Sequence, residues 1–303
     1  MEEWSGLFEA EVISRMDPTS RAVLAQVNRA GRDVVRLSPA DLACAGRTVG
    51  VKLKVADFVG SVKRLDWAQA NVCPWVARTF GRVARGGDLE ALQWARAHGC
   101  PWDGRACWYA ALDGHLDMVE WLIATGVDVN YVSSVKGSTP LYVAAQMGHL
   151  DTVGLLLDAG ADAGIARTDF GGTPLHVAAQ NGCTDVVALL LSAPGVDVNK
   201  ATNTGATPLY VASQNGHADV LDWLLVAPGL DVNMARTLDG ATPLCAAARN
   251  GHAYVVERLL AAPGVDINQA LWDGTTLLSI ALAGGHAQVI EKLRATGATE
   301  SHG

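Results

Sequence analysis

The sequence has 303 residues, half of them hydrophobic and 18% charged, and carries a formal net charge of −8. It has no run of 18 apolar residues, which excludes a membrane-spanning helix, and its acidic start lacks the basic-then-apolar order of a secretory signal. The six cysteines form no C-x-x-C pair, which favours reduced thiols over disulfides or zinc ligands. We therefore expect a cytoplasmic or nuclear protein with a packed core.

The charge divides unevenly along the chain. Residues 1–110 carry 15 Lys and Arg against 12 Asp and Glu, a net of +3. Residues 111–303 carry 8 against 19, a net of −11, and the two values sum to −8. An acidic surface repels phosphate backbones, so we expect no nucleic-acid partner.

The first 38 residues are predicted to form a helical hairpin. Phe8, Val12, Ile13 and Met16 lie at helical spacing, and Pro18 then breaks this helix before a second one begins. This helix, Asp-Pro turn and helix is similar to the F-box family. The resemblance implies that Val12, Ile13, Met16 and Pro18 bind a Skp-type adaptor of a cullin-type ubiquitin ligase. The alternative is a hairpin that only caps the following array, as helical repeat arrays require for solubility.

Residues 39–60 follow as a connector, and a repeat with a 27-residue period covers residues 61–103. Its two copies share the pattern Leu-x-Trp-Ala and end in Cys-Pro-Trp, at Trp75 and Trp102. Trp121 lies 27 residues after Trp94 and continues the same column. We interpret residues 61–103 as two short, degenerate units of the array that follows.

A longer repeat covers residues 104–303 and is clearest in the Thr-Pro-Leu-His segment at 173–176. The equivalent threonines, spaced by 34, 34, 35 and 34 residues, are Thr139, Thr173, Thr207, Thr242 and Thr276. Thr before Pro is typical of a helix N-cap and first helical position, and a glycine nine residues after each Thr is a typical helix stop. A second apolar pattern at helical spacing follows each glycine. The pattern predicts an all-α solenoid of stacked helix-turn-helix units.

The turns between units complete a family resemblance. Segments such as Asp197-Val198-Asn199 lead to a glycine two residues before each Thr, in two units as the Asp-Gly steps Asp239-Gly240 and Asp273-Gly274. Such glycines provide the positive φ of a tight turn, which we expect to project as a finger. With the Thr-Pro-Leu-His motif, these residues resemble the ankyrin repeat family over residues 104–297. The resemblance implies a non-catalytic scaffold, expected to be monomeric, that binds a partner protein through its finger tips and inner helices.

A column of histidines is the main chemical alternative. These residues each follow a turn glycine and are His115, His149, His217, His252 and His286. A repeat spreads equivalent side chains along the stack, whereas a metal or general-base site needs them to converge. We therefore expect hydrogen bonds between adjacent turns, and no catalytic, cofactor or metal site. His176 is expected to bond within the turn network.

The candidate binding residues vary within an otherwise regular repeat. On the finger tips they are Val135, Lys136, Asp169, Phe170, Asn203, Arg236, Leu238, Asp239, Trp272 and Asp273. On the inner helices they are Gln146, Gln180, Gln214 and Arg249. We expect Phe170, Leu238 and Trp272 to form an apolar strip, because bulky apolar groups at turn tips are typical of interfaces. The alternative is that the rings of Phe170 and Trp272 fold back onto their own stack.

Overall fold

Fourteen α-helices make up the regular structure of residues 77–134 and 136–299, the part of the chain that the computed structural model describes. The inner helices are α5 (Ala77–Arg85), α7 (Arg105–Asp113), α9 (Pro140–Met147), α11 (Pro174–Asn181), α13 (Pro208–Asn215), α15 (Pro243–Arg249) and α17 (Leu277–Gly284). The outer helices are α6 (Leu89–Ala97), α8 (Leu116–Ala124), α10 (Leu150–Asp158), α12 (Thr184–Ser192), α14 (Ala218–Leu225), α16 (Ala253–Leu260) and α18 (Ala287–Ala295). The predicted hairpin at 1–38, the connector at 39–60 and residues 61–76 lie outside the described residues.

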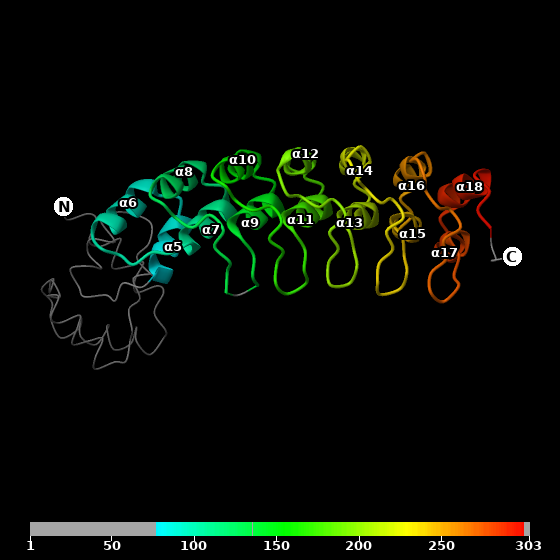
Figure 1. Cartoon of the computed structure of the whole chain (residues 1–303), viewed down its shortest axis with the longest axis horizontal. Coiled ribbons are helices and arrows are strands. Elements are labelled where there is room, and N and C mark those ends of the chain that lie inside the picture. Colours follow the sequence, from blue (N-terminus) through cyan, green and yellow to red (C-terminus); the bar gives the residue numbers. More distant parts are fainter. Residues whose placement is uncertain (1–76, 135, 300–303) are drawn as a thin grey trace, which may run out of the picture.

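The helices form an elongated, two-layered stack. Each inner helix packs on the next inner helix, and from α8 onward each outer helix packs on the next outer helix (Figure 1). From α9 onward, a long finger loop projects from the inner layer between successive units (Figure 1). The described residues contain no β-strand, so the predicted all-α solenoid is confirmed.

The helix ends follow from the repeated Thr and Gly positions. The hydroxyl of Thr207 accepts a hydrogen bond from the backbone N–H of Tyr210 at 3.1 Å, and Pro208 occupies the first helical position. Gly216 ends the same helix at φ 78°, a left-handed conformation that glycine adopts without steric cost. From α9 onward every inner helix has such a threonine at its N-cap, and α9, α11, α13 and α17 end at a left-handed glycine.

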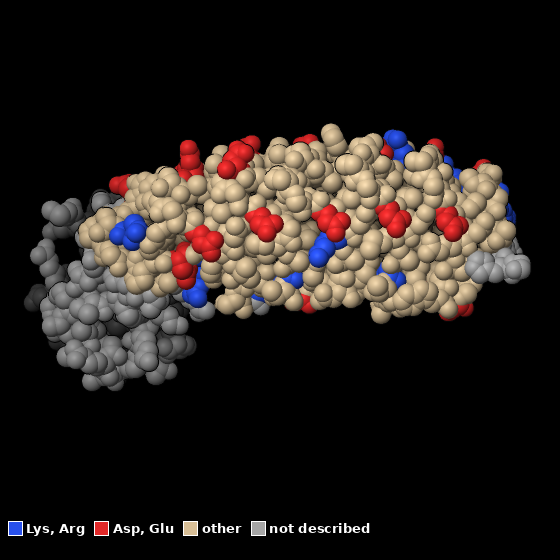
Figure 2. Space-filling model, viewed as in Figure 1, with Lys and Arg blue, Asp and Glu red and all other residues tan. Residues whose placement is uncertain are grey.

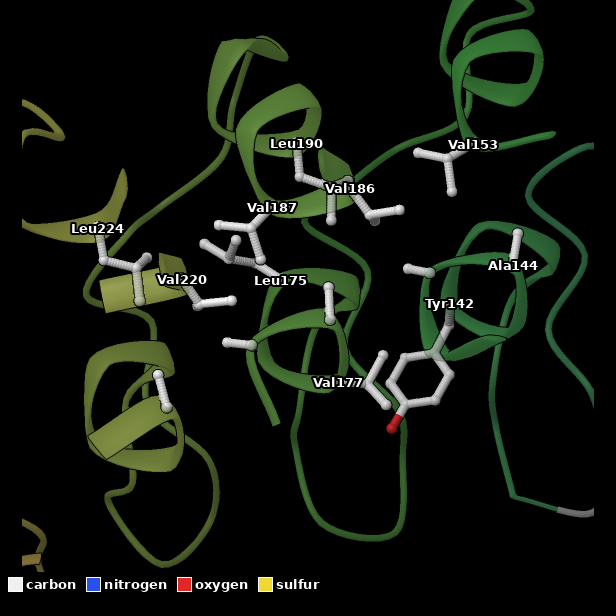
Figure 3. Close-up of a cluster of buried hydrophobic side chains, with 14 of the residues drawn as sticks. Tyr142, Ala144, Val153, Leu175, Val177, Val186, Val187, Leu190, Val220 and Leu224 are labelled. Atoms are coloured by element: carbon white, nitrogen blue, oxygen red, sulfur yellow. The ribbon is translucent and has the colours of Figure 1, made fainter. Parts of the chain in front are cut away.

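The core is a continuous row of aliphatic side chains between the two layers. The leucines two and seventeen residues after each Thr are at most 2% exposed: Leu141, Leu175, Leu209, Leu244, Leu278, Leu156, Leu190, Leu224, Leu259 and Leu293. Figure 3 shows Val186, Val187 and Leu190 of an outer helix facing Leu175 of an inner helix. Because each unit buries its faces mainly against its neighbours, stability depends on stacking rather than on one closed core.

Asparagines link the turns of neighbouring units. The side chain of Asn199 accepts a hydrogen bond from the Asp231 backbone N–H at 2.9 Å and donates one to the Gly229 carbonyl at 2.7 Å. Asn130 and Asn233 make the same pair of bonds to their next units. The recurring Asp-Val-Asn turn thus fixes the spacing of the stack.

The second copy of the predicted short repeat falls on α6 and the turn that follows it. Trp94 and Trp121 both occupy the sixth position of an outer helix, in α6 and α8. The Trp102 ring lies 6.1 Å from the Phe80 ring, centroid to centroid. The Cys100 thiol is buried, and this burial raises its pKa to about 12, so it stays protonated at neutral pH.

Among the described residues, none of the helices has the length and apolar character needed to cross a bilayer.

Candidate functional site

The histidine column links neighbouring units through backbone carbonyls. The Nε2 atom of His217 lies 2.9 Å from the Gln180 carbonyl oxygen, and that of His252 lies 3.0 Å from the Gln214 carbonyl oxygen. His115, His149 and His286 make equivalent contacts with the carbonyls of Arg85, Leu112 and Arg249. The predicted structural role of this column is confirmed. Within residues 77–134 and 136–299, no three His, Cys, Asp or Glu side chains are grouped to hold a metal ion.

His176 is held in one tautomer by its hydrogen bonds and is kept neutral by its burial. Its Nδ1 atom accepts a hydrogen bond from the Thr173 backbone N–H at 3.1 Å, so Nε2 carries the proton and donates to the Ala206 carbonyl at 3.2 Å. The ring is 2% exposed. This burial lowers the pKa of His176 from 6.5 to about 4. The bonding predicted for His176 within the turn network is therefore confirmed.

Acid should destabilise the protein through His176. Because the pKa of His176 is lower in the folded chain than in the unfolded chain, the stabilisation is fully present above pH 6.5 and is lost as pH falls toward 4. We expect the wild-type chain to lose about 2 kcal/mol more unfolding free energy between pH 7 and pH 4.5 than His176→Tyr. Tyr142 and Tyr210 occupy this position in other units, which makes tyrosine the matched replacement. Urea unfolding at both pH values measures the difference, and parallel losses in the two proteins would contradict the assignment.

Backbone hydrogen bonds hold neighbouring fingers side by side. The Asn203 N–H donates to the Phe170 carbonyl at 2.9 Å, and the Trp272 N–H donates to the Asp239 carbonyl at 3.1 Å. The second bond places the Trp272 finger directly beside the finger that carries Leu238. Two of the three predicted apolar tip residues are therefore neighbours in space.

The finger-tip side chains differ in exposure. Leu238 is 65% exposed and Trp272 is 68% exposed. The Trp272 indole lies over Gly240 of the preceding finger, where its Cδ1 atom would be only 2.5 Å from an added Cβ. Leu238 and Trp272 thus form an exposed apolar pair, which we call the tip pair.

Phe170 does not belong to the tip pair. Its ring is half-buried beside Gly172 of its own finger, and the guanidinium of Arg167 lies 5.0 Å from the ring centroid. The Asn203 finger separates it from Leu238. Lys136, Asp169 and Asn203 are exposed, whereas Val135 lies outside the described residues.

Two arginines at the finger bases form clusters that the sequence alone did not reveal. Arg236 binds both carboxylate oxygens of Asp239, at 3.0 and 2.6 Å, and its guanidinium lies 5.1 Å from the Tyr210 ring centroid. The hydrogen bond from Arg236 lowers the pKa of Asp239 to about 2. Arg167 repeats the arrangement with Asp169, at 2.6 Å, and with the Tyr142 ring, at 5.6 Å. A tyrosine followed in the next finger by Arg-x-Asp or Arg-x-x-Asp is the signal that could have identified them.

The inner-helix candidates line the side of the stack next to the fingers. Gln146 is half-buried, and Gln180, Gln214 and Arg249 are exposed. Arg249 approaches Asp239 to 3.5 Å, which joins the inner-helix column to the Arg236 cluster. At α15 the inner-helix candidate Arg249 therefore lies beside the tip candidate Asp239.

The turn side and the outer helices are acidic. Exposed aspartates recur in the turn of each unit, and Figure 2 shows acidic groups at regular intervals along one long face. The turn aspartates, whose Oδ1 atoms each accept a backbone N–H two residues further on, are Asp128, Asp162, Asp197, Asp231 and Asp266. On α14, Trp223 is 48% exposed and provides an aromatic surface group away from the fingers.

Comparison with known proteins agrees with this geometry. A family model described as "Ankyrin repeats (3 copies)" matches residues 80–167, 160–236 and 228–300, which together cover more than half of the chain. No curated protein matches the sequence. Repeats of this kind indicate a protein–protein interaction scaffold and are generally non-catalytic.

Proposed function

The chain belongs to the ankyrin repeat family, and on that premise we propose that it binds a partner protein through the finger tips and inner helices of residues 202–285. The observation that carries this proposal is the tip pair. Leu238 and Trp272 lie on adjacent fingers, and both are about two-thirds exposed. Large apolar side chains that stay exposed side by side on a rigid support are typical of interaction sites.

The residues around the tip pair also support a role for it as the centre of a protein interface. Asp239 and Asp273 flank it, and Arg249 and Gln214 extend it onto the inner helices. A central apolar group with a polar rim is the usual anatomy of a protein interface. Backbone hydrogen bonds between the fingers hold this arrangement before any partner arrives, which reduces the entropy lost on binding.

Site-specific photocrosslinking tests the proposed face. A photoreactive residue placed at Asn203, on an exposed finger, is expected to capture a partner from cell extract. The matched control carries the same residue at Asp185, which is exposed on the outer helix α12. Capture from Asp185 but not from Asn203 would place the binding surface on the outer helices and contradict the proposal.

The F-box resemblance gives a second candidate function, recognition of substrates for a cullin-type ubiquitin ligase. Its residues, Val12, Ile13, Met16 and Pro18, lie outside the described residues. The sequence observation that favours it is the helix, Asp-Pro turn and helix over residues 1–38.

If this second function is correct, Ile13→Asp should abolish binding to a Skp-type adaptor in a pulldown while leaving the thermal unfolding of the repeats unchanged. A charge removes the apolar contact on which such docking depends. If Ile13→Asp instead unfolds the first repeats, the segment is a cap, and the ligase function loses its support.

A further inference from the structure

An arginine that lies over an aromatic ring and pairs with an aspartate recurs along the stack. The Arg236 guanidinium lies 5.1 Å from the Tyr210 ring centroid and binds both carboxylate oxygens of Asp239. The same three groups meet elsewhere in residues 77–134 and 136–299, at Arg85–Tyr109–Asp113, Arg167–Tyr142–Asp169 and Arg258–Tyr254–Asp222. A ring face and a carboxylate both attract a guanidinium, so this combination is a recurrent arginine site in the protein.

The last finger contains the aspartate of this arrangement but not its arginine. Asp273 corresponds to Asp239, because each precedes a turn glycine and its Oδ1 atom accepts the backbone N–H two residues further on. Leu271 corresponds to Arg236, because the N–H of each bonds to the carbonyl just before the next helix N-cap. Leu271 has no charge, so this finger provides no cation for its own aspartate.

Asp273 is an exposed carboxylate that makes no ion pair with any described residue. The hydrogen bonds from Thr275 lower the pKa of Asp273, so the carboxylate is charged at neutral pH. The nearby Arg249 guanidinium approaches Asp239, at 3.5 Å. The indole of Trp272, the preceding residue, is 68% exposed, and no arginine or lysine of the described ranges lies over it. An aromatic ring and a carboxylate are thus present together without the cation that accompanies them elsewhere.

We propose that Trp272 and Asp273 bind an arginine side chain of the partner protein. The guanidinium would lie over the exposed indole and donate hydrogen bonds to the carboxylate, as Arg236 does with its own ring and aspartate. The net charge of −11 over residues 111–303 also attracts a basic segment. Leu238 lies beside this site and favours an apolar residue next to that arginine. This inference rests on the proposed function and names the side chain that the tip pair recognises.

A second exposed tryptophan provides a matched comparison within the protein. Trp223 is 48% exposed and directly follows Asp222, so it also lies next to an aspartate. Asp222 already pairs with Arg258, at 3.2 Å. An arginine of a partner therefore meets an uncompensated carboxylate at Trp272 but not at Trp223.

NMR titration of the ¹⁵N-labelled full chain with defined peptides tests the inference. The probes are acetyl-Leu-Arg-Leu-amide and the same peptide with citrulline, which has nearly the shape of arginine but no charge. We expect the arginine peptide to shift the indole N–H signal of Trp272 and not that of Trp223, each assigned from its Trp→Phe variant. Citrulline should weaken binding about 5- to 30-fold, because the cation–π contact and the ion pair are both lost.

Asp273→Asn separates the ion pair from the contact with the ring. Asparagine keeps the Oδ1 acceptor that the Thr275 N–H uses, so the turn should be retained. We expect this variant to bind the arginine peptide about 2- to 5-fold more weakly and the citrulline peptide as before. Asp185→Asn, on the exposed face of α12, is the control and should change neither affinity.

Three results would overturn the inference. They are equal affinities for the arginine and citrulline peptides, equal shifts at Trp223 and Trp272, and no shift at Trp272 with either peptide. The proposed function has separate measurements, namely crosslinking from Asn203 and the affinity of the Trp272→Ala variant for the partner. If those hold while the peptides show no preference for arginine, the tip pair binds its partner through apolar contacts alone.

Discussion

Leu190→Ala is expected to lower the free energy of unfolding by about 2–5 kcal/mol, because it leaves a cavity in the middle of the stack. Leu190 is fully buried in α12, and Figure 3 shows it above the inner helix that carries Leu175. Units on both sides depend on this one for their buried faces, so collapse around the cavity is limited. Urea unfolding followed by circular dichroism measures the loss.

Leu150→Ala is the matched control for this prediction. Leu150 begins the preceding outer helix and is 38% exposed, so its truncation should cost far less than that of Leu190. Equal unfolding midpoints for Leu190→Ala and the wild type would mean that the buried leucine column does not carry the stability of the repeats.

Trp272→Ala is expected to weaken partner binding by about 30-fold, equivalent to about 2 kcal/mol, and to leave the melting temperature nearly unchanged. The indole is 68% exposed in the free protein, so its truncation removes little buried area from the fold. In a complex, the same ring would lie next to Leu238 in the centre of the interface. Titration of the crosslinked partner, once identified, gives the dissociation constants.

Trp223→Ala provides the control for binding. This tryptophan is 48% exposed on α14, in the outer layer, and its loss should leave affinity unchanged. A lower melting temperature for Trp272→Ala with unchanged affinity would show that the indole stabilises the folded repeats, through its contact with Gly240, and does not bind the partner. Loss of affinity from Trp223→Ala alone would move the interface to the outer helices.

Most of the fold follows from chemistry that is local in the sequence. The Thr cap, the Pro that follows it and the glycine stop act within one helix, so their spacing predicts the inner helices from α9 onward. The bonds of the histidine column were also predictable, because a side chain that recurs once per unit faces the same neighbour each time. In a repeat protein, a contact between residues that are distant in the sequence recurs in each unit. It can therefore be predicted from the spacing of equivalent residues in a single sequence.

The candidate site was less predictable because it depends on what differs between units. Phe170 and Trp272 occupy the neighbouring tip columns, yet Arg167 covers the first ring while the second stays exposed. The contact between Arg236 and Tyr210 joins two units. It recurs between Arg167 and Tyr142 but is not made in every repeat. Such contacts depend on which side chains occupy two variable positions at once, and the periodicity does not specify these side chains.

Hydrogen–deuterium exchange of the full chain, with and without the crosslinked partner, tests the binding surface most directly. We expect the partner to slow exchange in the finger segments 202–206, 236–241 and 271–275 and at the ends of α11 and α13. The outer helices α10, α12 and α14 should exchange at the same rate in both samples. Protection confined to those outer helices, with the fingers unchanged, would contradict the account.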